Sequence, residues 1–177
     1  MKRIQYFFHA AVLLILLIFD QGTKYLARTY LPGKPKSLME GVFSFTYHEN
    51  RGSVWGILQG KIPLFLITSI ILFIVLAYVY IRMPKQKQYY PLLWVLVFMT
   101  AGALGNTIDR ACFGYVTDFL YFELINFPVF NIADCYITIT AFLTVFLIFT
   151  KYRNDEFSFL SIKRKDGGHA GKKSDED

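Results

Sequence analysis

Four long apolar segments dominate this chain of 177 residues, and they restrict it to a small set of folds. They cover residues 6–19, 62–81, 91–108 and 132–149. The second holds 20 residues without a charge, enough for a helix to cross a hydrocarbon layer about 30 Å thick. The first spans only if it continues to about residue 26, which places Asp20 in the outer region of the membrane. With 54% hydrophobic residues, the chain is predicted to be an all-α integral membrane protein with four transmembrane helices.

The distribution of basic residues predicts the orientation. The short loop at residues 82–90 carries Arg82, Lys85 and Lys87, whereas residues 111–131 contain no Lys or Arg. Short basic loops face the cytoplasm, so both termini are expected to be cytoplasmic. The spans are then about 6–26, 62–81, 91–110 and 132–150, with outer loops at about 27–61 and 111–131. The charged residues 151–177 are predicted to be a disordered cytoplasmic tail that follows the 1–150 membrane domain.

The first outer loop is predicted to hold a small β element on the membrane surface. Residues 42–47 (VFSFTY) are rich in β-branched and aromatic residues, which is typical of a strand. The Pro and Gly residues of "LPGKPK" predict a turn before it, and "HENRGSVWGI" has turn glycines that lead into a second strand.

In this topology, the unusual polar residues of the apolar chain collect at the outer side of the membrane. Polar groups inside a helical bundle usually pair with one another and mark function. The collected residues are Asp20, Lys24, Asn50, Asn106, Asp109, Arg110, Asp118, Asn131 and Asp134.

Local spacing allows simpler roles for several of these residues. Asp20 and Lys24 are four apart on a helix, so a structural ion pair is as well supported as a role at a site. Asn131 suits an N-cap, and Asp134 then falls at the third helical position, where a carboxylate favours the helix dipole. In span three, Asn106 shares a helical face with either Asp109 or Arg110, and small residues there permit close helix packing.

Asp118 and Asp134 also suggest chemistry. Two carboxylates in one site do not both ionise easily, which leaves one acid and one base near neutral pH. Such a pair hydrolyses a peptide bond by activating water, without a metal or cofactor. Two alternatives remain, namely a small proton-coupled transporter or relay protein, and a scaffold whose polar residues only orient the helices.

Five segments together resemble the ordered motifs of the lipoprotein signal peptidases, the type II signal peptidases of bacteria. The segments are DQGTK (20–24), NRGSVWGIL (50–58), AGALGNTIDR (101–110), VTDF (116–119) and FNIADCYI (130–137), and the resemblance runs from about residue 15 to 150. The chain departs from the family pattern at Ser53, Trp55 and Ala101, which are packing or ligand-contact positions.

The resemblance implies an aspartic endopeptidase of the bacterial cell membrane that removes signal peptides from prolipoproteins, cutting before a lipid-modified cysteine. It implies four helices with a small extracytoplasmic β-cradle, no cofactor, and inhibition by globomycin-like peptides. The net charge of +6 suits contact with membrane lipids and gives no indication of nucleic acid binding. The catalytic pair implied is Asp118 and Asp134, and the supporting residues are Asp20, Lys24, Asn50, Gly52, Asn106, Asp109, Arg110, Asn131 and Ala133. We expect Asp134 to be the ionised base, because a helix N-terminus favours its charge, and Asp118 to hold the shared proton.

Overall fold

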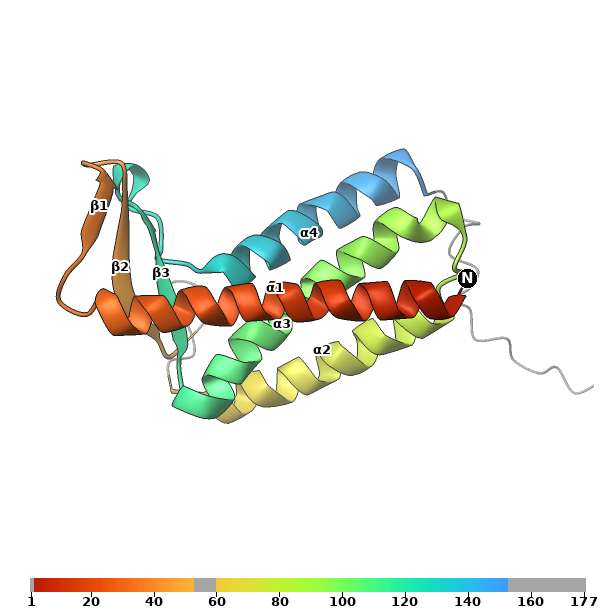
Figure 1. Cartoon of the computed structure of the whole chain (residues 1–177), viewed down its shortest axis with the longest axis horizontal. Helices are drawn as coiled ribbons and strands as arrows, with labels where there is room; N and C mark the ends of the chain where they lie inside the picture. Colours follow the sequence, from red (N-terminus) through yellow and green to blue (C-terminus); the bar gives the residue numbers. More distant parts are fainter. Residues whose placement is uncertain (1, 53–59, 153–177) are drawn as a thin grey trace, which may run out of the picture.

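The computed structural model describes residues 2–52 and 60–152, which form four helices and one small sheet (Figure 1). Each helix is long and apolar enough to cross a membrane, and a fifth such helix is not found in the described ranges. The helices are α1 (Lys2–Tyr30), α2 (Ile62–Arg82), α3 (Tyr90–Phe113) and α4 (Ile132–Thr150). Ser53, Trp55 and the charged tail from residue 153 lie outside the described residues.

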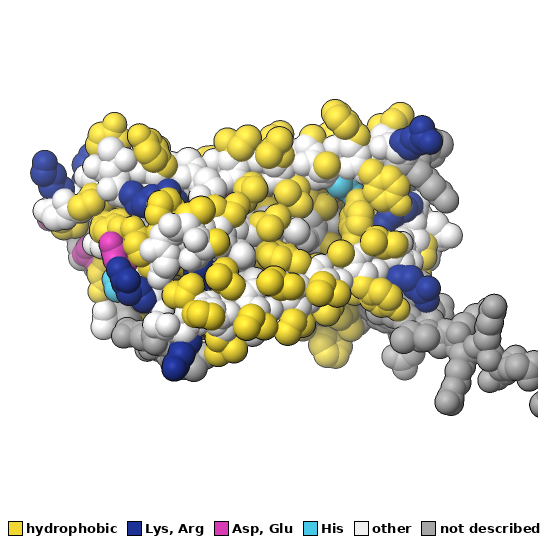
Figure 2. Space-filling view, turned by 90° about the horizontal axis from the view of Figure 1, so that it is seen from below, with side chains coloured by type: hydrophobic (Ala, Val, Ile, Leu, Met, Phe, Trp, Pro, Cys, Tyr) yellow, Lys and Arg dark blue, Asp and Glu magenta, His cyan; other side chains and the backbone are white. Residues whose placement is uncertain are grey.

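Helix α3 is the central helix of the bundle and packs against each of the other three (Figure 1). Half of its apolar span is buried, compared with about a tenth or less for the spans of α1, α2 and α4. The outer three helices therefore present most of their apolar side chains to the surroundings, as helices in lipid do. In Figure 2 hydrophobic side chains cover the middle of the molecule, and Lys and Arg gather towards its two ends.

Helix α1 continues past the apolar segment that begins it and ends at Tyr30. Its second half contains Asp20, Lys24 and Arg28 at intervals of four residues, so these polar side chains share one face. Asp20 and Lys24 are fully buried because this face lies against α3, α4 and the sheet. The helix therefore carries its charges into the protein interior and not into lipid.

The sheet lies at one end of the bundle, opposite the first residues of α1 and the last residues of α4 (Figure 1). Its antiparallel strands follow the order β1 (Lys36–Met39), β2 (Phe43–Asn50) and β3 (Val116–Phe122). The strand expected at residues 42–47 is confirmed from Phe43 on, as the first part of β2, and Val42 lies in the turn before it. The two partner strands differ from the expectation, because β1 follows the Pro/Gly turn and β3 comes from the segment between α3 and α4. Residues 48–50 continue β2, and the turn and second strand expected after them fall largely on residues 53–59, outside the described residues.

Pairing between β2 and β3 is the feature of the fold that most affects the candidate site. His48 is paired with Asp118 and Asn50 with Val116, although these strands are far apart in the sequence. The face of the sheet towards α1 is closed by an apolar cluster of Ala27, Leu31, Phe119 and Leu120. This cluster fixes the sheet on the end of α1, and Ile132 and Cys135 from the first turn of α4 pack against the same cluster.

Candidate active site

Two aspartates from different elements lie at the junction of the sheet and the bundle. Asp118 is in β3 and is 1% exposed. Asp134 is the third residue of α4, where its carboxylate accepts a hydrogen bond from the backbone N–H of Asn131 at 3.1 Å. The Asn131 side chain accepts in return from the Asp134 N–H at 3.0 Å, and this reciprocal capping box begins the helix. The expected N-cap is therefore confirmed, and it places Asn131 between Asp134 and Asp118 of β3.

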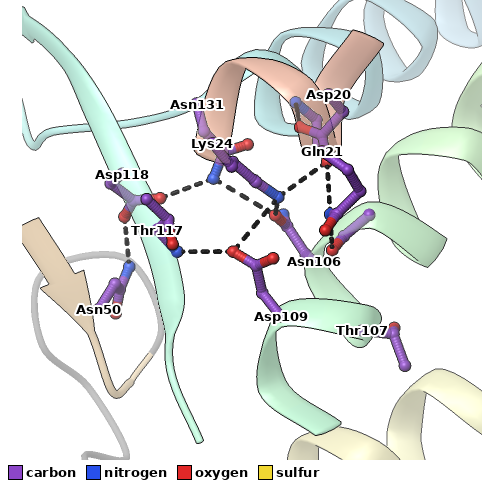
Figure 3. A network of polar contacts seen from close by, with 12 residues as sticks. Asp20, Gln21, Lys24, Asn50, Asn106, Thr107, Asp109, Thr117, Asp118 and Asn131 are labelled. Atoms are coloured by element: carbon purple, nitrogen blue, oxygen red, sulfur yellow. Dashed lines mark hydrogen bonds and ion pairs between the residues drawn. The ribbon is translucent and has the colours of Figure 1, made fainter. Parts of the chain in front are cut away.

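Asn131 also connects the two carboxylates. While its carbonyl oxygen caps α4, its amide nitrogen donates to Asp118 Oδ1 at 2.6 Å (Figure 3). A second donor, the amide of Asn50 at the end of β2, reaches Asp118 Oδ2 at 3.0 Å. Asp134 has a side-chain donor of its own, since the amide of Asn106 in α3 reaches its Oδ1 at 2.8 Å. Each carboxylate thus receives two N–H donors, and Asn131 serves both.

Burial and the neighbouring negative charge make Asp118 a weak acid. Desolvation raises the pKa of Asp118, and the charge of Asp134 raises it further, to about 7 from the ordinary value of 3.8. The hydrogen bonds from Asn50 and Asn131 oppose this rise and do not cancel it. A carboxyl with a pKa near 7 is protonated in a large fraction of molecules at neutral pH, which is what a general acid requires.

Lys24 fixes the orientation of the Asn106 amide. The Lys24 ammonium donates to Asn106 Oδ1 at 2.8 Å, and an ammonium has no lone pair with which to accept (Figure 3). The carbonyl oxygen of Asn106 must therefore face Lys24, and its NH₂ group must face Asp134. Lys24 is held by Asp20 at 3.0 Å and by Asp109 at 3.8 Å, all three side chains being fully buried. The predicted ion pair between Asp20 and Lys24 is present, and it belongs to the site network.

Asp20 in turn holds the beginning of α4. Its Oδ1 accepts from the backbone N–H of Ala133 at 3.0 Å, one of the N–H groups that a helix leaves unpaired at its start. Helix α3 lies directly against this contact, and a Cβ at Gly105 would overlap the Asp20 carboxylate. A Cβ at Gly102 would come within 2.6 Å of the Ala133 carbonyl oxygen. The small residues of span three therefore do permit close packing, as the sequence predicted.

Asp109 and Arg110 both take part, on different sides of α3. The carboxylate of Asp109 accepts from the backbone N–H of Thr117 at 2.8 Å, immediately before Asp118. Arg110 donates to the carbonyl oxygen of Gly52 at 3.3 Å and stacks over the Phe65 ring at 4.6 Å. The N–H of Gly52 donates to Asn50 Oδ1 at 3.0 Å, which leaves the Asn50 NH₂ group directed at Asp118. Every site residue expected from the sequence is therefore in one connected network.

Three members of the network were not expected from the sequence, namely Gln21, Arg28 and Thr117. The amide nitrogen of Gln21 donates to Asp20 Oδ2 and to the Gly105 carbonyl oxygen, both at 3.1 Å. Arg28 donates to the hydroxyl of Thr117 at 2.8 Å and lies 3.5 Å from Asp109 Oδ1. It also stacks over the Phe113 ring at 4.4 Å, so it ties α1 to the end of α3 and to β3. The sequence did indicate a position for Arg28 on the polar face of α1, because Arg28 follows Asp20 and Lys24 at the same four-residue interval. Thr117 had no such signal, since its role depends on where β3 runs.

Taken together, fold and network define a polytopic membrane protein with two hydrogen-bonded aspartates at one end of its helices. Residues 12–150 match the family model described as signal peptidase (SPase) II. A lipoprotein signal peptidase of Caldanaerobacter subterraneus is 39% identical over 145 residues, covering 80% of this chain and 97% of that protein. One from Staphylococcus aureus is 38% identical over 146 residues, covering 80% and 88%.

Solved structures agree with this result. Two structures of a bacterial membrane enzyme superpose with TM-scores of 0.72 and 0.71, at 35% and 36% sequence identity. They cover 82% and 81% of this chain and 93% and 94% of the matched chains. The chain belongs to the signal peptidase II family, whose members are membrane proteases.

Proposed function

We propose that this protein is an aspartic endopeptidase that removes signal peptides from diacylglyceryl-modified prolipoproteins, cutting before the lipidated cysteine. The observation that carries the proposal is the pair of carboxylates joined by Asn131, one of which has a pKa near 7. Membership of the signal peptidase II family supports a protease, and the relatives bear the name lipoprotein signal peptidase.

In the proposed mechanism the pair carries one proton between its two carboxylates. Asp134 is ionised, since the first turn of α4 and the N–H of Asn131 stabilise its charge. It takes a proton from a water molecule, whose oxygen attacks the scissile carbonyl carbon. Asp118 donates its proton to the carbonyl oxygen, which forms a neutral tetrahedral intermediate.

Collapse of the intermediate returns the pair to its starting state. The C–N bond breaks as the proton held by Asp134 moves to the departing nitrogen, and Asp118 recovers its proton from a hydroxyl of the intermediate. The products are the carboxyl end of the signal peptide and the amino group of the cysteine. Asn50, Asn106 and Asn131 hold the two carboxyl groups in position throughout, so little reorganisation accompanies the reaction.

We further propose that the sheet end of the molecule faces the extracytoplasmic side of the cell membrane. Arg82, Lys85 and Lys87 lie at the opposite end, and short basic loops face the cytoplasm. Both termini are then cytoplasmic, and a lipid-anchored substrate reaches the site laterally from the outer leaflet. A globomycin-like cyclic peptide would compete for this same site.

The position of the network favours a peptidase over a proton relay. A relay needs titratable groups along the path across the membrane. Here the carboxylate pair and its supporting residues are at the sheet end, and His9 near the other end bonds to Tyr80 and does not reach them.

The test is cleavage of a diacylglyceryl-modified prolipoprotein by the purified protein, followed by mass spectrometry. Asp118→Asn and Asp134→Asn keep the side-chain shape and should each abolish cleavage while the protein stays folded. Glu40→Gln is the matched control, because Glu40 is an exposed carboxylate in the turn between β1 and β2. Cleavage that survives either aspartate substitution would overturn the catalytic pair. Failure of well-folded wild type on several such substrates would favour the relay instead.

A further inference from the structure

A groove separate from the carboxylate pair lies between the outer end of α1 and the sheet. Its volume is about 280 Å³, and most of its lining is apolar. Leu26, Ala27 and Tyr30 line it from α1, Phe45 from β2 and Phe119 from β3, and Lys36 lies at the start of β1. Leu26 and Tyr30 are more than half exposed, so the groove opens along the outside of the helix.

The location of the groove determines which molecules reach it. The first span is expected to end near residue 26 and α1 continues to Tyr30, so the groove lies at the level where the hydrocarbon of one leaflet meets the headgroups. Tyr30 has the amphipathic side chain that is enriched at that level. The molecules that surround the open side of the groove are therefore membrane lipids.

The chemistry of the lining selects among possible occupants. The polar side chains in the lining are Thr23, Tyr30 and Lys36, and the hydroxyl of Thr23 already donates to the Asp20 carbonyl oxygen. A peptide backbone in this groove would leave its N–H and C=O groups without partners, at a cost that an acyl chain does not incur. Lys36 contributes a positive charge, and no carboxylate of the described residues forms an ion pair with it. An apolar slot with one cation at the headgroup level fits an acyl chain that carries an anionic headgroup.

We propose that this groove is a binding site for one anionic phospholipid, with an acyl chain along Leu26 and Phe119 and the phosphate at Lys36. A diacylglyceryl group alone would fill the groove and leave the Lys36 charge without a partner. A zwitterionic lipid would bring its own cation close to Lys36. The bound lipid would lie against Phe119, the residue after Asp118, and so would support β3 beside the carboxylate pair. The lipid site does not depend on the proposed peptidase activity.

The test measures lipids retained by the full-length protein in native mass spectrometry, using phosphatidylglycerol and phosphatidylcholine of identical acyl chains. One cation at a membrane surface corresponds to a preference of about fivefold for the anionic lipid. Wild type should show this preference, and Lys36→Gln should remove it. Lys34→Gln is the matched control and should keep it, since Lys34 is a nearby exposed lysine outside the lining.

A second variant tests the apolar part of the site. Leu26→Trp adds volume inside the groove at an exposed helix position, so it should lower the retention of both lipids without unfolding the protein. Equal retention of the two lipids by wild type would overturn the proposal. So would an equal loss of preference in Lys36→Gln and Lys34→Gln, because the effect would then come from general surface charge.

Discussion

Replacing Asp118 by Asn should change how the stability of this protein depends on pH. Asp118 is 1% exposed, and its pKa is raised from 3.8 to about 7 by burial and by the charge of Asp134. In the unfolded chain the carboxyl loses its proton near pH 4, whereas in the folded chain it keeps the proton until about pH 7. Between these values the folded state binds more protons, so the free energy of unfolding falls as the pH rises.

The size of the effect follows from the same pKa. Each pH unit inside the window changes the free energy of unfolding by at most about 1.4 kcal/mol, which gives about 3 kcal/mol between pH 5 and pH 8. An Asn side chain does not ionise, so this loss is absent in the variant. The variant has a different cost, because its NH₂ group faces a donor from Asn50 or Asn131. That mismatch costs about 1–3 kcal/mol at every pH.

The assay is denaturant or thermal unfolding of both proteins in one detergent at pH 5, 6, 7 and 8. We expect Asp118→Asn to be less stable than wild type at pH 5 and to regain about 3 kcal/mol relative to it by pH 8. The peptidase rate of the wild type should fall above about pH 7, as the pair loses its shared proton. Parallel stability curves for the two proteins from pH 5 to pH 8 would refute the reasoning.

Three further predictions test the supporting network. Gly105→Ala should lower the free energy of unfolding by about 1–3 kcal/mol, because the added Cβ would overlap the Asp20 carboxylate. Gly22→Ala is the control in the same unfolding assay. Its Cβ meets no other atom, so it should stabilise α1 by about 0.5–1 kcal/mol. Lys24→Met leaves the buried Asp20 carboxylate without a cation and leaves Asp109 with Arg28 alone, so it should cost about 3–5 kcal/mol. Normal expression and stability of this variant would contradict the ion network. Arg28→Gln should lower kcat with little change in KM, and Arg28→Lys should restore part of the rate. The reason is that Arg28 binds Asp109 and Thr117 of β3, so it positions Asp118 and does not itself contact the substrate.

The sequence by itself determined the four spans and the end of the molecule at which the polar residues meet. Hydropathy is a local property, and an apolar run of sufficient length has few alternatives to a spanning helix. Once the spans alternate in direction, Asp20, Asn106 and Asp134 must lie towards the same end. The capping role of Asn131 could also be predicted from the sequence, because a helix cap depends on a few consecutive residues.

Only the tertiary structure decided which of these side chains bond to one another. Asn50 reaches Asp118 because β2 pairs with β3. The two strands are far apart in the sequence, and no local sequence pattern indicates which distant strand will pair with which. The sequence left open whether Asp109 or Arg110 faces the site, and α3 uses both because different neighbours flank it. The orientation of the Asn106 amide is set by a lysine from another helix, 82 residues away in the chain. A sequence specifies such contacts only through the packing of the whole bundle, because hydrogen bonds between distant residues depend on positions that no local pattern encodes.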